Sequence, residues 1–368
     1  MALVASACGN GGDEGTDGST TDGSTSSSDT APEQGAGYQI AFLYDGPIDD
    51  GGWNTSFKAA ADSVGEQLPG ATITNIENVS PGDQLQAAMS DLASQGYDLI
   101  VGTQFAQPDM LKIAPDFPDT KFLGWGGWKT ADNVGQFSGA TEDGRYLDGI
   151  VAGSVTEANI VGYVAGFPIP EVVRGINAFI LGAQSVNPDV QVIPVYTNSW
   201  YDPAKEREAA QSLVDAGADI LVMETNTPAV ASVAERNGVG MIGYGWDQSA
   251  RSPNTWLSSF TFDWGPHLAG QAVAVVDGTW QPEVFYGGVA DEMVGLSPFG
   301  SGVPQEVQDL TEEQKQAIAS GALDVLAGPI SDNQGTVVVS EGETIPPEER
   351  PNCCDWYAAG IQGTVPSG

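Results

Sequence analysis

The sequence is poor in basic residues and in side chains that bind metals. Its 368 residues include 12 Lys and Arg against 49 Asp and Glu, so the formal net charge is −37. Such a chain repels nucleic-acid phosphates and anionic lipid headgroups, which argues against DNA or RNA binding. With one His and three Cys, a tetrahedral metal site lacks ligands. We expect no metal and no cofactor.

The common catalytic motifs are also missing. The sequence has no Gly-x-x-x-x-Gly-Lys-Ser/Thr loop, no Gly-x-Gly-x-x-Gly turn after a predicted strand and no Gly-x-Ser-x-Gly elbow. The single histidine, His267, falls at the start of a predicted helix and is a poor candidate base. Carboxylates such as Asp50, Glu142 and Asp247 keep an extracellular hydrolase open as an alternative. A protein without enzymatic activity is the better prediction.

The N-terminal region is typical of a tethered protein. Leu3 to Cys8 is similar to the end of a bacterial lipoprotein signal, so residues 1–8 are interpreted as a truncated signal with lipidation at Cys8. Residues 9–37 are rich in Gly, Ser, Thr and Asp and are predicted to form a disordered tether. No run of 18 apolar residues follows. We expect a globular protein that is lipid-anchored on the extracytoplasmic face of the cell membrane.

Apart from Cys8, the only cysteines are Cys353 and Cys354. Adjacent cysteines close a disulfide only with a distorted peptide. The sequence therefore leaves a Cys353–Cys354 disulfide and two free thiols equally open.

From residue 38 onward, short β-rich runs alternate with helical stretches, which predicts parallel sheets built from βαβ units. Two such series follow one another and predict two doubly wound lobes with a cleft between them. Lobe 1 is assigned to residues 38–140 plus 258–282, and lobe 2 to residues 141–257 plus 283–365. A late helix is expected from Thr311 to Ser320, with an N-cap at its start.

Aromatic side chains follow several predicted strands. They are Phe105, Trp200, Trp246, the pair Trp125 and Trp128, and Trp53 after the first strand. Ligands of open α/β sheets bind outside the carboxyl ends of the strands, so these aromatics predict a slot for a flat ring. Any one Trp could equally belong to the core. We expect Trp53 and Trp200, from opposite lobes, to sandwich the ring.

Polar residues near those aromatics could bond to the edge of the ring. The candidates are Asp50, Asn54, Asn226 and Asp247, with Glu142 also near the cleft. The alternative role for each is a helix cap or a turn, and Asp202 before Pro203 is a good N-cap in its own right.

Four segments together resemble one protein family. They are Asp50-Gly-Gly-Trp-Asn54, Glu142-Asp-Gly-Arg-Tyr-Leu-Asp-Gly149, the run from Phe167 to Phe179, and Asn198-Ser-Trp-Tyr-Asp-Pro-Ala-Lys205. The chain resembles the basic-membrane-protein family of bacterial lipoproteins, which are the substrate-binding components of ABC importers for purine nucleosides or bases. The resemblance implies a type I periplasmic-binding fold, a monomer, an ABC permease as partner, and aromatic stacking by Trp53 and Trp200 on a purine.

One departure from the family bears on the ligand. The resemblance implies an Asp for ribose hydroxyls where this chain has Gly245, and a bulky Trp246 follows. Loss of a ribose clamp and gain of an indole favour a free base such as adenine. A purine nucleoside, another heterocycle or a sugar remains open, whereas a cytoplasmic repressor core of the same fold is disfavoured because no helix-turn-helix precedes it.

Overall fold

The protein's structure, a computed structural model, describes residues 33–366. The first of its two larger sheets has six strands in the order β12-β5-β4-β3-β1-β2, all parallel. The strands are β1 (Gln39–Leu43), β2 (Thr72–Ile76), β3 (Leu99–Phe105), β4 (Lys121–Trp125), β5 (Val134–Gly139) and β12 (Val284–Gly287). The central strands are buried on both faces, as expected for a parallel sheet between helices.

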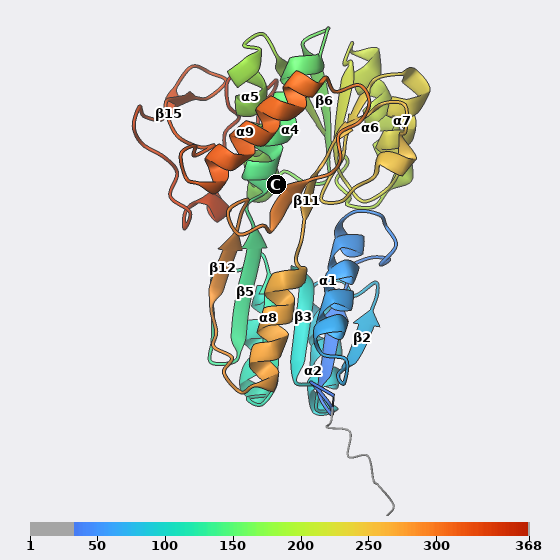
Figure 1. Cartoon of the computed structure of the whole chain (residues 1–368), viewed down its shortest axis with the longest axis vertical. Helices are drawn as coiled ribbons and strands as arrows, with labels where there is room; N and C mark the ends of the chain where they lie inside the picture. The colour runs from blue at the N-terminus through green and yellow to red at the C-terminus, as the bar shows by residue number, and fades with distance from the viewer. Residues whose placement is uncertain (1–32, 367–368) are drawn as a thin grey trace, which may run out of the picture. The chain divides into compact units, whose positions relative to one another are not determined.

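Helices cover this sheet. They are α1 (Trp53–Gln67), α2 (Asp83–Ser94), α3 (Gln107–Ile113), which runs into a short 3₁₀ turn η1 (Ala114–Asp116), and α8 (Gly265–Val276). Figure 1 shows α1 in blue beside α8 in orange, although more than 190 residues separate them in the chain, and the two helices pack together. The indole of Trp264, fully buried just before α8, donates to the Ser56 hydroxyl in α1 over 3.0 Å.

The second sheet has five parallel strands in the order β10-β9-β8-β6-β7. They are β6 (Ile160–Ala165), β7 (Gln191–Tyr196), β8 (Ile220–Glu224), β9 (Gly240–Ile242) and β10 (Trp256–Ser258), and the 3₁₀ turn η2 (Ser249–Arg251) precedes β10. Its helices are α4 (Thr141–Val155), α5 (Pro170–Val186), α6 (Pro203–Asp215) and α7 (Ala229–Asn237), and α9 (Gln305–Ala319) lies along α4 (Figure 1).

The chain passes between the two sheets after β5, after β10 and after β12. An antiparallel pair, β11 (Phe260–Phe262) and β13 (Val294–Leu296), joins two of these passages. A second small pair, β14 (Ile330–Ser331) and β15 (Val337–Val339), and the 3₁₀ turn η3 (Arg350–Asn352) belong to the C-terminal region. None of the helices within residues 33–366 is long and apolar enough to cross a membrane.

The predicted fold class is confirmed, because both larger sheets are parallel and their strands alternate with helices along the chain. Asp202 caps α6 as expected, because its Oδ1 accepts from the backbone N–H groups of Ala204 and Lys205 at 3.1 Å each. Pro170 and Pro203 open their helices at positions where a missing N–H is harmless.

Three expectations about segment limits were wrong. Strand β12, which was assigned to lobe 2, pairs with β5 in the first sheet. Helix α9 begins at Gln305, and the expected cap residue Thr311 lies inside it, with its hydroxyl donating to the carbonyl of Val307. Residues 33–37, the end of the predicted tether, form turns in which the carbonyl of Gln34 accepts from the backbone N–H of Gly70 at 2.9 Å.

Candidate functional site

A cavity lies at the carboxyl ends of the strands of both parallel sheets. Its empty volume is about 410 Å³, including the part open to solvent. The residues that line it end or follow β1, β3 and β4 of the first sheet and follow β6, β7, β8 and β9 of the second: Asp45, Trp53, Gln104, Phe105, Trp125, Ile169, Glu171, Trp200, Asn226 and Tyr244. This is the position at which doubly wound folds bind ligands.

On the side of the first sheet, Trp53 is the central aromatic. Its Nε1 donates to the carbonyl of Thr103 over 3.0 Å, which fixes the plane of the indole. Trp125 packs edge-on against it with ring centroids 4.6 Å apart, and Phe105 packs edge-on against Trp125 at 4.7 Å. Phe105 is 45% exposed, so one wall of the cavity is an aromatic side chain that solvent reaches.

On the side of the second sheet, Trp200 is half-buried and packs edge-on against Phe167 with centroids 5.3 Å apart. Its six-membered ring lies directly over Gly166, where any Cβ would overlap the indole. The carbonyl of Trp200 accepts from the backbone N–H of Asn226 over 2.8 Å, which links two lining residues. A glycine and a backbone hydrogen bond therefore hold this indole at the rim.

Three cavity-lining side chains carry buried polar atoms without a hydrogen-bond partner among residues 33–366. They are Asp45 Oδ1, Gln104 Oε1 and Trp125 Nε1. Two of these atoms accept hydrogen bonds and one donates. Because an unpaired buried polar group is costly, such atoms in the wall of a cavity are typical of a site that bonds to a ligand.

Glu171, in the first turn of α5, adds a titratable group to the wall. Burial, the largest cause, and the neighbouring carboxyl of Glu224 together raise its pKa from 4.5 to about 7, although Arg174 offsets part of the rise. Its Oε1 accepts from the hydroxyl of Thr141 over 2.8 Å. Near neutral pH this carboxyl can either donate or accept a hydrogen bond.

Side chains after β9 also reach across to the loop after β1. Gln248 Nε2 donates to the carbonyl of Gly51 over 2.7 Å, and Arg251 Nη2 donates to the carbonyl of Asp50 over 3.0 Å. These bonds join the two sheets at the rim of the cavity. Gly51 has φ +72°, and a Cβ there would overlap the Arg251 guanidinium, so the contact depends on glycine.

Four of the nine predicted ligand residues line this cavity: Trp53, Phe105, Trp200 and Asn226. Asp50 and Asn54 do not. The Asp50 carboxylate accepts from the backbone N–H groups of Gly52 and Asn54 at 2.8 and 3.0 Å, and Asn54 Nδ2 donates to the same carboxylate. Asp50 therefore holds the start of α1, which was its alternative role.

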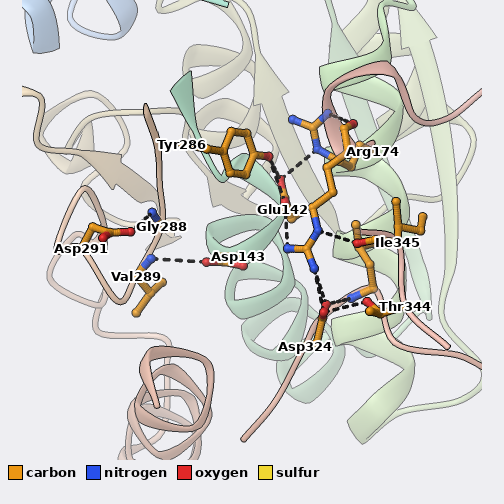
Figure 2. A network of polar contacts seen from close by, with 12 residues as sticks. Glu142, Asp143, Arg174, Tyr286, Gly288, Val289, Asp291, Asp324, Thr344 and Ile345 are labelled. Atoms are coloured by element: carbon orange, nitrogen blue, oxygen red, sulfur yellow. Dashed lines mark hydrogen bonds and ion pairs between the residues drawn. The ribbon is translucent and has the colours of Figure 1, made fainter. Parts of the chain in front are cut away.

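Glu142, a predicted ligand residue, also does not line the cavity. It lies in a buried network of ion pairs. Figure 2 shows Glu142 between Tyr286 and Arg174. The Tyr286 hydroxyl and Arg174 Nε donate to its Oε2, each over 2.9 Å, and Arg350 Nη1 lies 3.4 Å from its Oε1. This carboxylate contacts two arginines and links the segment around η3 to α4 and α5.

Trp246 and Asp247 lie outside the lining of the cavity. Trp246 is half-buried, and Asp247 is exposed with its carboxylate accepting from the backbone N–H of Ser249 in a turn. The residue from this loop that does line the cavity is Tyr244, whose ring is nearly parallel to that of Trp53, with centroids 6.2 Å apart. Trp246 is absent from the lining of this cavity, so its effect on a sugar pocket stays a prediction.

Sequence reasoning named Trp125 among the strand-end aromatics but did not select Asp45, Gln104, Glu171 or Tyr244. Asp45, Gln104 and Tyr244 stand at or just after the ends of strands, so their position relative to the strands was the available signal. For Glu171, the signal was its place one residue after Pro170, which begins α5. Cys8 lies outside the described residues. Cys353 and Cys354 are joined by a disulfide.

Two parallel sheets that meet at a shared ligand-sized cavity define a two-lobed solute-binding protein of the type I periplasmic fold. A solved ABC transporter solute-binding protein from Conexibacter woesei superposes with a TM-score of 0.67 at 25% identity, covering 78% of this chain and 98% of that one. The model of the family described as "ABC transporter substrate-binding protein PnrA-like" matches residues 38–324. The chain belongs to this family, whose members are substrate-binding proteins and not enzymes.

Two relatives cover almost the whole chain. A purine-binding protein of Brucella abortus is 36% identical over 330 residues, which are 89% of this chain and 94% of the relative. A putative ABC transporter glucose-binding protein of Haloferax volcanii is 34% identical over 353 residues, covering 96% of this chain and 87% of the relative.

Proposed function

We propose that this substrate-binding protein captures a free purine base, such as adenine, for an ABC permease. The observation that carries the proposal is a cavity lined by an indole from each sheet and by three buried polar atoms that have no partner among the described residues. Aromatic faces suit a planar heterocycle, and the polar atoms suit its edge. The purine-binding relative at 36% identity supports the same ligand class.

The polar atoms also favour a free base over a nucleoside. Adenine carries N–H donors at its exocyclic amine and at N9, and its other ring nitrogens accept. Asp45 Oδ1 and Gln104 Oε1 can take the two donors, and Trp125 Nε1 can donate to a ring nitrogen. A nucleoside has lost the N9 proton. Gly245, in place of the ribose-binding Asp that the family resemblance implies, supports the same preference.

The proposed mechanism is closure of the two lobes on the ring. Trp53 supplies one aromatic face and Trp200 the other, and the ligand stabilises the closed arrangement by contacting both lobes. The bonds from Gln248 and Arg251 to the loop after β1 add direct contacts across the cleft. A monomer, tethered outside the cytoplasmic membrane by a lipid on Cys8, would present the closed form to the permease.

The test is calorimetric titration of residues 33–368, after ligand stripping by unfolding and refolding, with adenine, hypoxanthine, guanine and their ribonucleosides. Adenine binding in the micromolar range or tighter, with the nucleoside at least about tenfold weaker, is expected. Tighter nucleoside binding would overturn the base preference alone. Absence of binding by all six compounds would overturn the purine assignment.

A sugar is the second candidate, because the Haloferax volcanii relative is named as a putative glucose-binding protein. Sugars also stack on indole faces, so glucose belongs in the same titration. Binding of glucose without any purine would replace the proposal.

A further inference from the structure

A second cavity adjoins the first, and three residues line both of them. Phe105, Trp125 and Glu171 line both cavities. The second has an empty volume of about 700 Å³, including the part open to solvent. The two cavities are therefore neighbours along the side chains of Phe105, Trp125 and Glu171.

The second cavity is lined by both aromatic and polar side chains. Trp128 joins Phe105 and Trp125 as aromatic lining, and Ser138, Arg174 and Tyr286 contribute polar atoms. Ser138 is 5% exposed, and its buried hydroxyl has no hydrogen-bond partner among the described residues. The indole nitrogen of Trp125 has no partner among them either. The Trp125 N–H is assigned to the ring in the first cavity, whereas the Ser138 hydroxyl can donate or accept and so suits a hydroxyl group of the ligand.

The charges around this cavity do not suit an anion. Arg174 Nε lies 2.9 Å from Glu142 Oε2, and Arg350 Nη2 lies 2.7 Å from Asp324 Oδ2. Figure 2 shows the contact between Arg174 and Glu142. With Glu171 also in the wall, the carboxyl groups outnumber the guanidinium groups, so a phosphate would find no unpaired positive charge.

We propose that the second cavity is a subsite for a short, uncharged, hydroxylated substituent on the heterocycle held in the first cavity. The subsite rests on the proposed function, since it needs a ring in the first cavity. The substituent's methylene groups contact Phe105 and Trp128, and its hydroxyl bonds to Ser138. The substrate class is then hydroxyalkyl-substituted purine bases alongside the unsubstituted base.

The test uses a variant that fills the second cavity from its rim. Asn352 is exposed and lines this cavity but not the first. Asn352→Trp therefore narrows the subsite without disturbing the core, and Gln334→Trp is the matched control at another exposed amide outside both cavities. Ser138→Ala removes the unpartnered hydroxyl. Adenine, N6-(2-hydroxyethyl)adenine, 9-(2-hydroxyethyl)adenine and the phosphate esters of the two alcohols are titrated by calorimetry.

At least one hydroxyethyl compound is expected to bind the parent protein within about threefold of adenine, and its phosphate ester at least about tenfold more weakly. Asn352→Trp should weaken that compound about tenfold or more while adenine changes less than about twofold, and Ser138→Ala should weaken it about threefold or more. Gln334→Trp should change neither ligand.

Adenine binding with both hydroxyethyl compounds rejected, or an equal effect of Asn352→Trp on all ligands, would overturn the subsite and leave the proposed function standing. Phosphate esters that bind better than their alcohols would also overturn it. Failure of every purine to bind would overturn the proposed function and the subsite together.

Discussion

Trp200 is the lining aromatic whose removal should affect the ligand most and the fold least. It is half-buried at the rim, whereas Trp53 is buried among Phe57, Trp125 and Trp264. Trp200→Ala is expected to weaken purine binding more than about tenfold through loss of stacking area. Calorimetric titration gives the affinity, and the urea midpoint should stay near that of the parent protein.

The neighbouring Tyr201→Ala is the control for that prediction. Tyr201 is 53% exposed and lines neither the ligand cavity nor the cavity beside it. The Tyr201→Ala variant should bind the purine with the same affinity as the parent protein. Unchanged binding in Trp200→Ala would remove Trp200 from the site.

Glu171 predicts a specific pH dependence. Its folded-state pKa is raised from 4.5 to about 7, so the folded protein holds this proton more tightly than the unfolded chain. The contribution of Glu171 to the free energy of unfolding is therefore largest below pH about 4.5 and declines as the pH rises to about 7. Glu171→Gln should make the fall in stability over that range less steep in urea unfolding at several pH values.

Glu208→Gln, at an exposed position on α6, should leave the slope of stability against pH unchanged. Equal slopes for Glu171→Gln and the parent protein would show that the carboxyl of Glu171 titrates as it does in the unfolded chain.

At the residue scale, the sequence identified the aromatics better than the polar groups. Trp53 and Trp200 follow strands of opposite sheets, and a parallel sheet brings all its strand ends to one edge. The carboxylates gave no comparable signal, because capping, ion pairing and ligand binding use the same side chain. Asp50 accepts from backbone N–H groups at the start of α1 and Glu142 pairs with arginines, whereas Asp45 lines the cavity.

Helices α4 and α5 pack closely because glycines face the partner backbone. A Cβ on Gly149 would overlap the carbonyl oxygen of Phe179, and one on Gly182 would overlap that of Tyr146. Gly149→Val is therefore expected to lower the free energy of unfolding by about 3 kcal/mol or more, since the helices must separate. Urea unfolding followed by circular dichroism measures the change.

The control for helix packing is Gly270→Ala in α8. Gly270 is exposed and no atom lies within 4 Å of the position of an added Cβ. Stability should rise by about 0.5–1 kcal/mol, because alanine favours the helix over glycine. A small effect of Gly149→Val would show that α4 and α5 can move apart at little cost.

At the element scale, local sequence signals placed most strands and helices. The ends of these elements, and the sheet to which a strand belongs, depended on the segments packed against them. Strand β12 belongs to the first sheet because it pairs with β5, which is 145 or more residues earlier in the chain. No local pattern in Val284–Gly287 contains that information. Thr311 resembles an N-cap by its sequence, but the preceding turns of α9 extend back to Gln305.

The whole molecule carries a net charge of −37, which predicts stabilisation by salt. Carboxylate repulsion is greater in the compact protein than in the unfolded chain, and about 1 M NaCl reduces the Debye length to about 3 Å. The urea midpoint should rise between about 0.02 M and 1 M NaCl. A constant or falling midpoint would show that exposed ion pairs such as Lys58 with Asp62, which salt weakens, outweigh the repulsion.

The sequence by itself determined the fold class, the aromatic character of the site and the capping of α6 by Asp202. These features follow from hydrophobic periodicity, strand-end position and residues a few places apart, and such local interactions are present in the linear order. Only the tertiary structure decided which polar groups line the cavity, that β12 joins the first sheet, and that a second cavity adjoins the first. Those features depend on side chains from both sheets, which only the folded chain brings together.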